Sequence, residues 1–344
     1  MEQKQKKRLD EVTLMRCILA ILIVFMHSFT CYDGSWHEPA GYVDVPLYMW
    51  LSRVSFAFTL EAFVFISGYL FAFQRIILNR MGGGINLIIN KLKRLILPSV
   101  IFSALYFLLF CEYNGIGQLL YSIINGCGHM WFLPMLFWCF IMVWIFEQIK
   151  VSDGFKIAIL VCLNLFFVVS LPLRLSMTAT YLIYFYGGYV IYKHSAVIKS
   201  SLTSKHIIWC WVVFIFLFVV FRPLKETLII GNGENILSKA LTISGKHACQ
   251  LIYGSVGTIS FYITAVWYTQ RKQLKIFTLK LASLCFGIYL FHQFVLQLLY
   301  YHTSLSPVVG PYWLPWIGFA FAFIVSLLLS VFSSNTKLGR ILLG

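Results

Sequence analysis

Acidic side chains are scarce in this chain, which holds 12 Asp and Glu against 27 Lys and Arg in 344 residues. The four charged types make up 11% of the sequence, hydrophobic residues make up 60%, and the mean hydropathy is +0.83. So low a charged fraction excludes an ordinary soluble protein and is typical of an integral membrane protein. The chain also lacks a polar domain in which basic residues alternate with aromatics. Its net charge of +15 therefore predicts no nucleic-acid partner.

Metal-binding patterns are missing as well. The nine cysteines are scattered, mostly within apolar runs, and no CxxC pair or Cys/His spacing typical of a zinc site occurs. Internal repeats, low-complexity tracts and a soluble catalytic domain are also lacking. We therefore expect one membrane-embedded domain over residues 1–344, with cytosolic segments at 1–11 and 334–344 and without a bound metal.

Apolar runs long enough to cross a bilayer recur along the chain and predict an all-α, polytopic membrane protein with about ten transmembrane helices. They lie near residues 12–32, 55–73, 95–113, 130–149, 157–175, 177–192, 207–221, 248–268, 281–301 and 313–333. With the N-terminus inside, 20 of the 27 Lys and Arg fall in inside segments and six fall outside. The positive-inside rule then places both termini in the cytoplasm.

The first run carries one arginine and one histidine inside its apolar stretch at residues 14–30. Arg16 and His27 are eleven residues apart, so in a helix they share a face and lie about 16 Å apart along the axis. Ionisable groups inside a bilayer are costly and usually face a bundle interior or a water-filled cavity. The pair therefore predicts a functional site, with Arg16 near the inner boundary and His27 near the outer one. The structural alternatives are a snorkelling Arg16 and a hydrogen-bonded core His27.

Glu61 lies in the second run, about 9 Å below the outer surface if that helix starts at residue 55. This is the depth predicted for His27. A carboxylate beside an imidazole fixes its tautomer and raises its basicity, so we expect Glu61 to orient His27 as a general base. A structural ion pair of Glu61 is the alternative. In the same run, Ser67 and Gly68 predict the close approach of another helix.

Other polar groups stand near the ends of further runs. An amphipathic, basic segment precedes the third run, and its Lys91, Lys93 and Arg94 are placed to meet cytosolic anions or, alternatively, lipid headgroups. At the outer start of the fourth run stand His129 and Trp131, of which Trp131 would also suit an interfacial aromatic belt.

Two polar side chains also project from the ninth run. Tyr289 and His292 are three residues apart, and His292 lies about 17 Å from the cytosolic end of that helix, near the middle of the membrane. A histidine at this depth is compatible with either a structural or a functional role.

Taken together, these residues resemble the acyltransferase-3 family, the membrane-bound bacterial O-acyltransferases that modify surface polysaccharides. Arg16 and His27 match the R-x10-H signature of its first helix. Four further landmarks follow in family order: Glu61 with SGY at 67–69, KLKRLILP at 91–98, HMWFL at 129–133, and the S-x5-Y-x2-H pattern formed by Ser283, Tyr289 and His292. In two respects the chain departs from the family. Thr13 stands where an acid commonly precedes the arginine, and no SGNH-type domain follows the tenth run, so the resemblance implies the stand-alone form.

The resemblance implies an O-acetyltransferase in the bacterial plasma membrane. Its donor would be a cytosolic acyl-CoA, usually acetyl-CoA, and its acceptor a hydroxyl of a cell-surface or exported polysaccharide or of a lipid-linked glycan. His27 would act as general base or transiently carry the acyl group, with Glu61 orienting it. The CoA phosphates would be held by Arg16, Lys91, Lys93 and Arg94. The residues that would contact the acceptor or stabilise the oxyanion are His129, Trp131, Tyr289 and His292.

A transporter or flippase for a glycan or a small solute is the rival interpretation, because helices with buried polar residues also form solute paths. Against it, strong charges within the runs are few, and no paired Gly/Pro-broken helices recur in two halves of the chain. Acceptor-dependent release of free CoA would separate the two classes.

Overall fold

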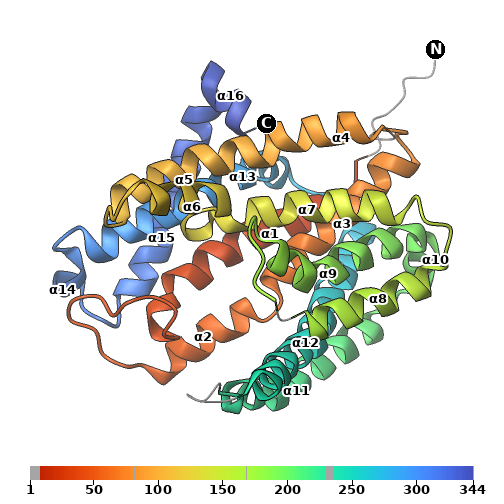
Figure 1. Ribbon diagram of the computed structural model, residues 1–344, viewed down its shortest axis with the longest axis horizontal. Helices are drawn as coiled ribbons and strands as arrows, with labels where there is room; N and C mark the ends of the chain where they lie inside the picture. Colours follow the sequence, from red (N-terminus) through yellow and green to blue (C-terminus); the bar gives the residue numbers. More distant parts are fainter. Residues whose placement is uncertain (1–7, 81–82, 168, 230–234, 344) are drawn as a thin grey trace.

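The computed structural model of the protein describes residues 8–80, 83–167, 169–229 and 235–343. Helices dominate, and no β-strand occurs in these ranges (Figure 1). The α-helices are α1 Asp10–Ser28, α2 Pro46–Phe56, α3 Thr59–Ile76, α4 Gly84–Lys91, α5 Leu97–Phe110, α6 Ile116–Asn125, α7 Phe132–Phe146, α8 Asp153–Phe166, α9 Leu175–Lys193, α10 Ser195–Ser201, α11 Ser204–Thr227, α12 Ile236–Arg271, α13 Ile276–Tyr301, α14 Leu305–Val309, α15 Leu314–Ser334 and α16 Lys337–Leu343. Short 3-10 turns form η1 Thr30–Tyr32 and η3 Gly128–Trp131, and a π-helical turn forms η2 Leu92–Ile96.

Among the described residues, eight helical segments are long and apolar enough to cross a membrane. They are Asp10–Ser28, Pro46–Ile76, Gly84–Phe110, Gly128–Phe146, Ser204–Thr227, Ile236–Arg271, Ile276–Tyr301 and Leu314–Ser334. The runs expected at 157–175 and 177–192 correspond to α8 and α9. However, α8 has only 14 residues and is about 21 Å long, against a hydrocarbon core of about 30 Å. The count of ten therefore stays a prediction.

Several expected boundaries differ from the structure, and local geometry explains two of them. Helix α8 ends at Phe166, well before residue 175, and both Leu173 and Arg174 adopt a left-handed backbone that no helix can continue through. Helix α12 begins at Ile236, twelve residues before the expected run, because the Asn235 side chain caps it by accepting from the backbone N–H of Ser238 at 2.8 Å.

Segments that were expected on one side of the membrane meet at one end of the molecule. Near the start of α1, Glu11 forms an ion pair with Lys199 of α10 at 2.7 Å and accepts from the Tyr69 hydroxyl of α3 at 2.9 Å. At the opposite end, the Tyr48 hydroxyl of α2 donates to the carbonyl of Tyr312 at 2.8 Å. In Figure 1 α16 lies at the top, and α2 and α14 lie at the lower left. Which end faces the cytoplasm stays a prediction.

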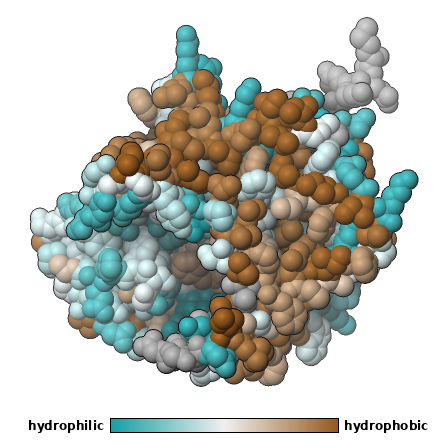
Figure 2. Space-filling view, viewed as in Figure 1, coloured by the Kyte–Doolittle hydropathy of each residue, from teal (hydrophilic) through white to brown (hydrophobic). Residues whose placement is uncertain are grey.

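Large hydrophobic side chains cover much of the outer surface of the helices. Helix α11 alone exposes Ile208, Trp209 and Phe216, each by more than half. In the view of Figure 2, hydrophobic residues gather across the top and right, whereas the left side is paler and more hydrophilic. In water such a surface is unfavourable, and it suits contact with lipid.

Close packing of α3 against α9 depends on two glycines. A Cβ on Gly68 would lie 1.9 Å from the carbonyl oxygen of Phe185, and a Cβ on Gly188 would lie 2.0 Å from that of Phe65. Each glycine thus admits the backbone of the other helix, as small residues do at membrane helix interfaces. The close approach predicted at Gly68 is confirmed.

We expect Gly188→Ala to separate α3 from α9 and to destabilise the protein by about 1–3 kcal/mol, as overpacking of a tight core does. Gly187→Ala is the matched control, since a Cβ at this neighbouring position meets nothing within 4 Å and alanine is the better helix former. The midpoint temperature of thermal unfolding in lipid nanodiscs measures the stability of both variants. Equal midpoints for the two variants would show that the glycine contact is not needed.

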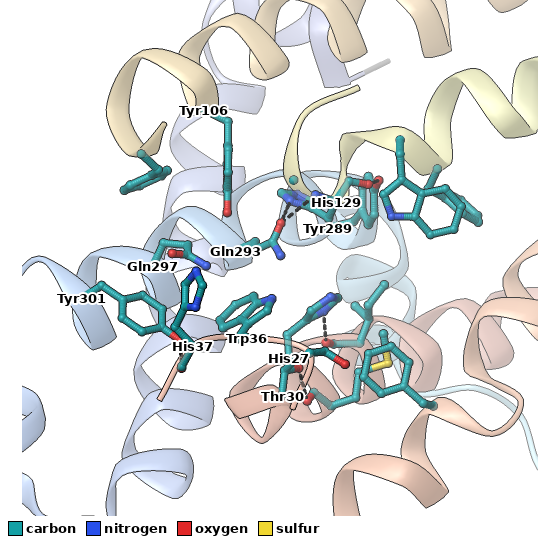
Figure 3. A pocket seen from close by; sticks show the side chains of 18 of the residues that line it. His27, Thr30, Trp36, His37, Tyr106, His129, Tyr289, Gln293, Gln297 and Tyr301 are labelled. Carbon is teal, nitrogen blue, oxygen red and sulfur yellow. Dashed lines mark hydrogen bonds between the residues drawn. The ribbon is translucent and has the colours of Figure 1, made fainter. Parts of the chain in front are cut away.

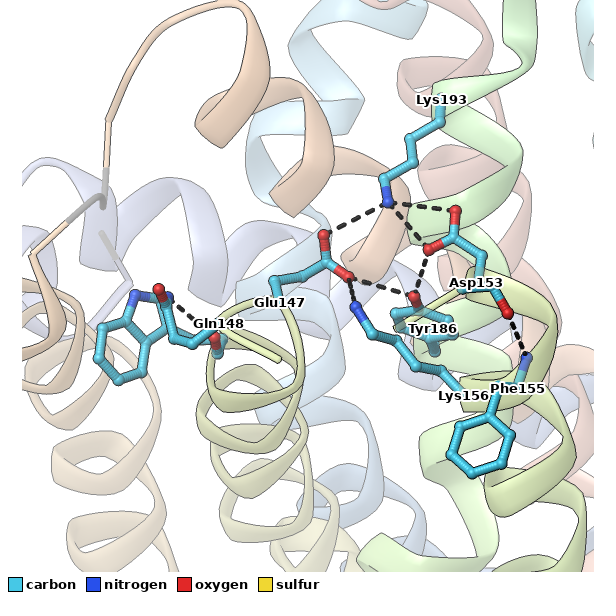
Figure 4. Close-up of polar contacts among 9 residues, drawn as sticks. Glu147, Gln148, Asp153, Phe155, Lys156, Tyr186 and Lys193 are labelled. Carbon is cyan, nitrogen blue, oxygen red and sulfur yellow. Dashed lines mark hydrogen bonds and ion pairs between the residues drawn. The ribbon is translucent and has the colours of Figure 1, made fainter. Parts of the chain in front are cut away.

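An ion-pair network joins the ends of α7, α8 and α9 (Figure 4). Glu147 accepts from Lys156 at 3.0 Å and lies 3.3 Å from Lys193, which also pairs with Asp153 at 3.1 Å. The Tyr186 hydroxyl donates to Asp153 at 2.7 Å. Burial alone would raise the pKa of Glu147, but the hydrogen bond from Lys156 and the charge of Lys193 hold that pKa below its usual range. The network therefore fixes the short helix α8 at this end of the molecule.

Candidate active site

A cavity of about 800 Å³, here called the histidine cavity, opens beside the C-terminal end of α1 (Figure 3). This volume falls within the range of about 300–1,000 Å³ that is usual for ligand pockets. Its walls come from α1, the loop after it, α2, α3, α5, the η3 turn, α7 and α13. The lining residues are Ile23, Met26, His27, Thr30, Gly34, Ser35, Trp36, His37, Phe56, Leu60, Tyr106, Phe110, Cys111, Gly128, His129, Trp131, Phe132, Tyr289, Gln293, Gln297, Tyr301 and His302.

The half-buried imidazole of His27 is held through one ring nitrogen. Its Nδ1 lies 2.9 Å from the carbonyl oxygen of Ile23 and 3.1 Å from Nε2 of His292. Nδ1 of His292 in turn lies 2.7 Å from the carbonyl of Tyr289 and 3.2 Å from that of Ile288. Because carbonyls only accept, neutral His292 carries its proton on Nδ1 and accepts through Nε2. His27 then donates from Nδ1, and its Nε2 keeps a free lone pair.

His129 is held differently from His27. Its Nδ1 donates to Oε1 of Gln293, its backbone N–H donates to the same oxygen at 2.7 Å, and its Nε2 lies 3.2 Å from the carbonyl of Leu290. The Tyr289 hydroxyl donates to the carbonyl of His129 at 2.6 Å. Both ring nitrogens of His129 thus face protein acceptors. Of the two histidines, His27 is the one with a nitrogen free to take a proton.

The loop after α1, residues 29–45, is tied down over the histidine cavity by tyrosine hydroxyls. Tyr301 donates to the carbonyl of His37 at 2.7 Å, and Tyr32 donates to that of Pro311 at 2.5 Å. This loop brings the Trp36 ring to 5.9 Å from the His27 ring, centroid to centroid. The Trp36 face and the His27 base therefore lie next to each other (Figure 3).

A second cavity of about 430 Å³, here called the basic cavity, lies toward the N-terminal end of α1. Its lining residues are Arg16, Ile23, Leu60, Phe63, Ile66, Ser67, Leu70, Lys91, Arg94, Leu95, Phe132, Leu133, Leu136, Phe140, Ala282, Ser283, Cys285, Phe286, Tyr289 and Leu343. No carboxylate is among them. Lys91 is 8% exposed, and its Nζ sits 3.4 Å from the centre of the Phe140 ring. Within the described ranges, none of Arg16, Lys91 and Arg94 has an ion pair or a side-chain hydrogen bond. Three cations without counter-ions fit an anionic ligand such as a phosphate.

Four residues line both cavities and form a shared wall: Ile23, Leu60, Phe132 and Tyr289. They come from α1, α3, α7 and α13. The two cavities therefore meet end to end along α1, with Arg16 in one and His27 in the other. Ligands bound in the two cavities would approach each other at these four side chains.

Glu61 does not contact His27. It is 1% exposed, and its Oε1 accepts from Nε2 of Gln250 at 2.5 Å, while its Oε2 has no hydrogen-bond partner among the described residues. The neighbouring Leu60 faces both cavities, and Glu61, about 100° further around α3, points toward α12. The groups that contact Nδ1 of His27 are the Ile23 carbonyl and His292 instead.

Two more expectations need correction. His292 is fully buried behind His27 and lines neither cavity, so it is not placed to contact a substrate. Lys93 is exposed and lines neither cavity, because successive residues of the π-helical turn point in different directions. By contrast, Arg16, Lys91 and Arg94 converge in the basic cavity. The histidine cavity receives His129 and Trp131, and Tyr289 reaches both cavities.

Several cavity residues were missed by sequence reasoning. A stripe on α13 with a spacing of four residues, Tyr289, Gln293, Gln297 and Tyr301, lines the histidine cavity. This spacing puts polar-tipped side chains on one face of an apolar helix, a signal that the sequence carries. Trp36 and its neighbours in the loop after α1 gave no comparable signal. Across the described residues, no group of three or more His, Cys, Asp or Glu is arranged to hold a metal ion.

The family model described as an acyltransferase domain, that of the acyltransferase-3 family, matches residues 9–334. The chain therefore belongs to the acyltransferase-3 family, and it is a multi-pass membrane protein. Comparison with curated proteins and with solved structures gives no match.

Proposed function

We propose that this chain is an O-acyltransferase of the bacterial plasma membrane. It would take an acyl group, acetyl by preference, from cytosolic acyl-CoA and place it on a hydroxyl of a cell-surface or exported polysaccharide or its lipid-linked precursor. The observation that carries the proposal is the pair of cavities that share one wall. One is lined by three basic side chains that have no ion pair within the described ranges, and the other holds a histidine with a ring nitrogen that no described residue engages.

The basic cavity is where the donor would bind. No carboxylate is among its described lining residues, so the charges of Arg16, Lys91 and Arg94 are available to the phosphates of CoA. Apolar side chains fill the rest of this cavity as far as Tyr289 and Phe132, and they would exclude water from the acyl thioester. In this orientation the start of α1 faces the cytoplasm, as the distribution of basic residues predicts.

His27 would act as the general base. Its Nε2 accepts the proton of the acceptor hydroxyl while the hydroxyl oxygen forms a bond to the thioester carbonyl carbon. When the tetrahedral intermediate collapses, the carbon–sulfur bond breaks and the proton on His27 Nε2 passes to the departing thiolate. The products are an ester and free CoA, and His27 is neutral again. Throughout, Nδ1 stays bonded to the Ile23 carbonyl and to His292, so the ring keeps its orientation.

We expect the purified protein in nanodiscs to release free CoA from acetyl-CoA only when a glycan acceptor is present. The glycan should gain an alkali-labile ester, visible as an O-acetyl signal by NMR. A thiol assay of CoA release, run alongside glycan NMR, measures both products. Transport of a solute into vesicles without acyl turnover would refute the proposal and favour the transporter interpretation.

A further inference from the structure

The histidine cavity is lined by histidines but by no permanently charged side chain in the described part of the protein. Of its 22 lining residues there, none is Asp, Glu, Lys or Arg. Its polar atoms belong to hydroxyls, amides, imidazoles and indole N–H groups, which between them can donate to and accept from the hydroxyls of a sugar. Gln297 and Trp36 have no side-chain hydrogen-bond partner within the described ranges, and both point into the cavity in Figure 3.

The loop segments that contribute residues to this cavity, here called its rim, contain carboxylates but no Lys or Arg. Three segments, residues 29–45, 111–131 and 301–313, contribute lining residues, and together they contain four carboxylates and no Lys or Arg. The carboxylates are Asp33, Glu38, Asp44 and Glu112. None of them forms an ion pair with a described residue.

Tyr42 and Arg174 report on the electrostatic potential near these carboxylates. Burial raises the pKa of Tyr42 above its usual range, and the charges of Asp44 and Glu38 raise it further. Arg174 approaches from the turn before α9, but its guanidinium donates to the carbonyls of Asn125 and Gly126 and does not line the cavity. An anion entering here would pass these carboxylates and would meet no Lys or Arg among the described lining residues.

We propose that the acceptor is an uncharged sugar unit, such as a neutral hexose or an N-acetylated hexosamine, and that this cavity excludes sugars bearing a carboxylate, sulfate or phosphate. The proposal rests on the proposed function above and names its substrate class. Its physical basis is the cost of moving an anion out of water into a cavity without counter-charge, together with repulsion at the rim. The described lining of the basic cavity, by contrast, contains cations and no carboxylate. We therefore infer that the basic cavity selects anionic ligands and the histidine cavity selects uncharged ones.

The test uses two acceptors of nearly the same shape, a glycoside of glucuronamide and the same glycoside of glucuronic acid, which differ by one negative charge. Binding is measured by calorimetry in nanodiscs without donor, and acyl transfer is measured with acetyl-CoA. We expect the amide to bind and react about tenfold better or more at low salt. The difference in affinity and rate between the two acceptors should become smaller at high salt, because salt screens the charges of the rim carboxylates.

Rim variants sharpen this test. The double variant Glu38→Gln/Asp44→Asn should narrow the ratio between the two acceptors severalfold at low salt, because it removes two of the four rim carboxylates. Asp10→Asn removes a carboxylate at the opposite end of α1 and should leave the ratio as it is.

Three results would overturn the inference: equal or better binding of the acid, failure of both acceptors to bind, or a ratio that the rim variant leaves unchanged. Preferential binding of the amide without acyl transfer to any acceptor would refute the proposed function alone, because binding is measured without turnover.

Discussion

Replacing His27 by alanine is expected to lower the rate of acyl transfer by a factor of about 10²–10⁴, the usual contribution of a general base. The reason is geometric: within the described part of the histidine cavity, the ring nitrogens of His129 face protein acceptors, whereas Nε2 of His27 is free. The rate of CoA release at matched membrane abundance measures the effect. His194→Ala, which removes an exposed histidine at the end of α9, controls for the loss of any histidine. A wild-type rate in His27→Ala would end the catalytic role of this residue.

The contact between Nδ1 of His27 and Nε2 of His292 can be tested separately. His292→Gln keeps an oxygen that can accept from Nδ1 of His27, whereas His292→Leu removes the acceptor. We expect the glutamine variant to retain more activity than the leucine variant and to keep the pH profile of the wild type. Equal losses in both variants would make His292 a packing residue rather than a positioning residue for His27.

Replacing Arg16 by alanine is expected to raise the KM for acetyl-CoA by about 10- to 100-fold with a smaller change in kcat, since a hydrogen bond to a charged group contributes about 1.5–3 kcal/mol. Lys91→Ala and Arg94→Ala should act in the same direction, because all three cations line the basic cavity. Steady-state kinetics with varied acetyl-CoA measures the change.

Two controls separate a binding site from general charge attraction. Lys93 is next to Arg94 but lines neither cavity, so Lys93→Ala should leave the KM near that of the wild type. Acetyl-pantetheine, which lacks phosphates, should show the same KM with wild type and with Arg16→Ala. If Lys93→Ala raised the KM for acetyl-CoA as strongly as Arg16→Ala does, a local phosphate site at Arg16 would be refuted.

Much of the fold follows from local sequence properties. Apolar runs predict helices wherever they occur, and the glycine in the second run correctly predicts the close contact of α3 with α9. The spacing of Arg16 and His27 was also informative, because eleven residues of a single helix fix both their distance and their common face. Each of them lines a cavity.

The rotation of a helix about its own axis was harder to predict. A span such as α3 is apolar on all sides, so its sequence gives depth but no preferred face. Glu61 was therefore placed beside His27 on depth alone, although Leu60 is the residue that faces the cavities. The loop that brings Trp36 over His27 escaped prediction for another reason. Its position is set by bonds to residues about 260–280 positions away, such as that from Tyr301 to the carbonyl of His37, and short-range patterns do not encode such contacts.

The shared wall of Ile23, Leu60, Phe132 and Tyr289 also bears on how well the membrane holds its proton gradient. A membrane protein that is hollowed from both ends would dissipate the proton gradient if water ran through it without interruption. Three of the four wall side chains are hydrocarbon, and the Tyr289 hydroxyl is already bonded to the His129 carbonyl, so the wall offers protons no ready conducting chain. The same four side chains place mainly apolar groups at the point where donor and acceptor would meet, and we expect polar substitutions there to increase proton leakage across the membrane, a cost that is separate from catalysis.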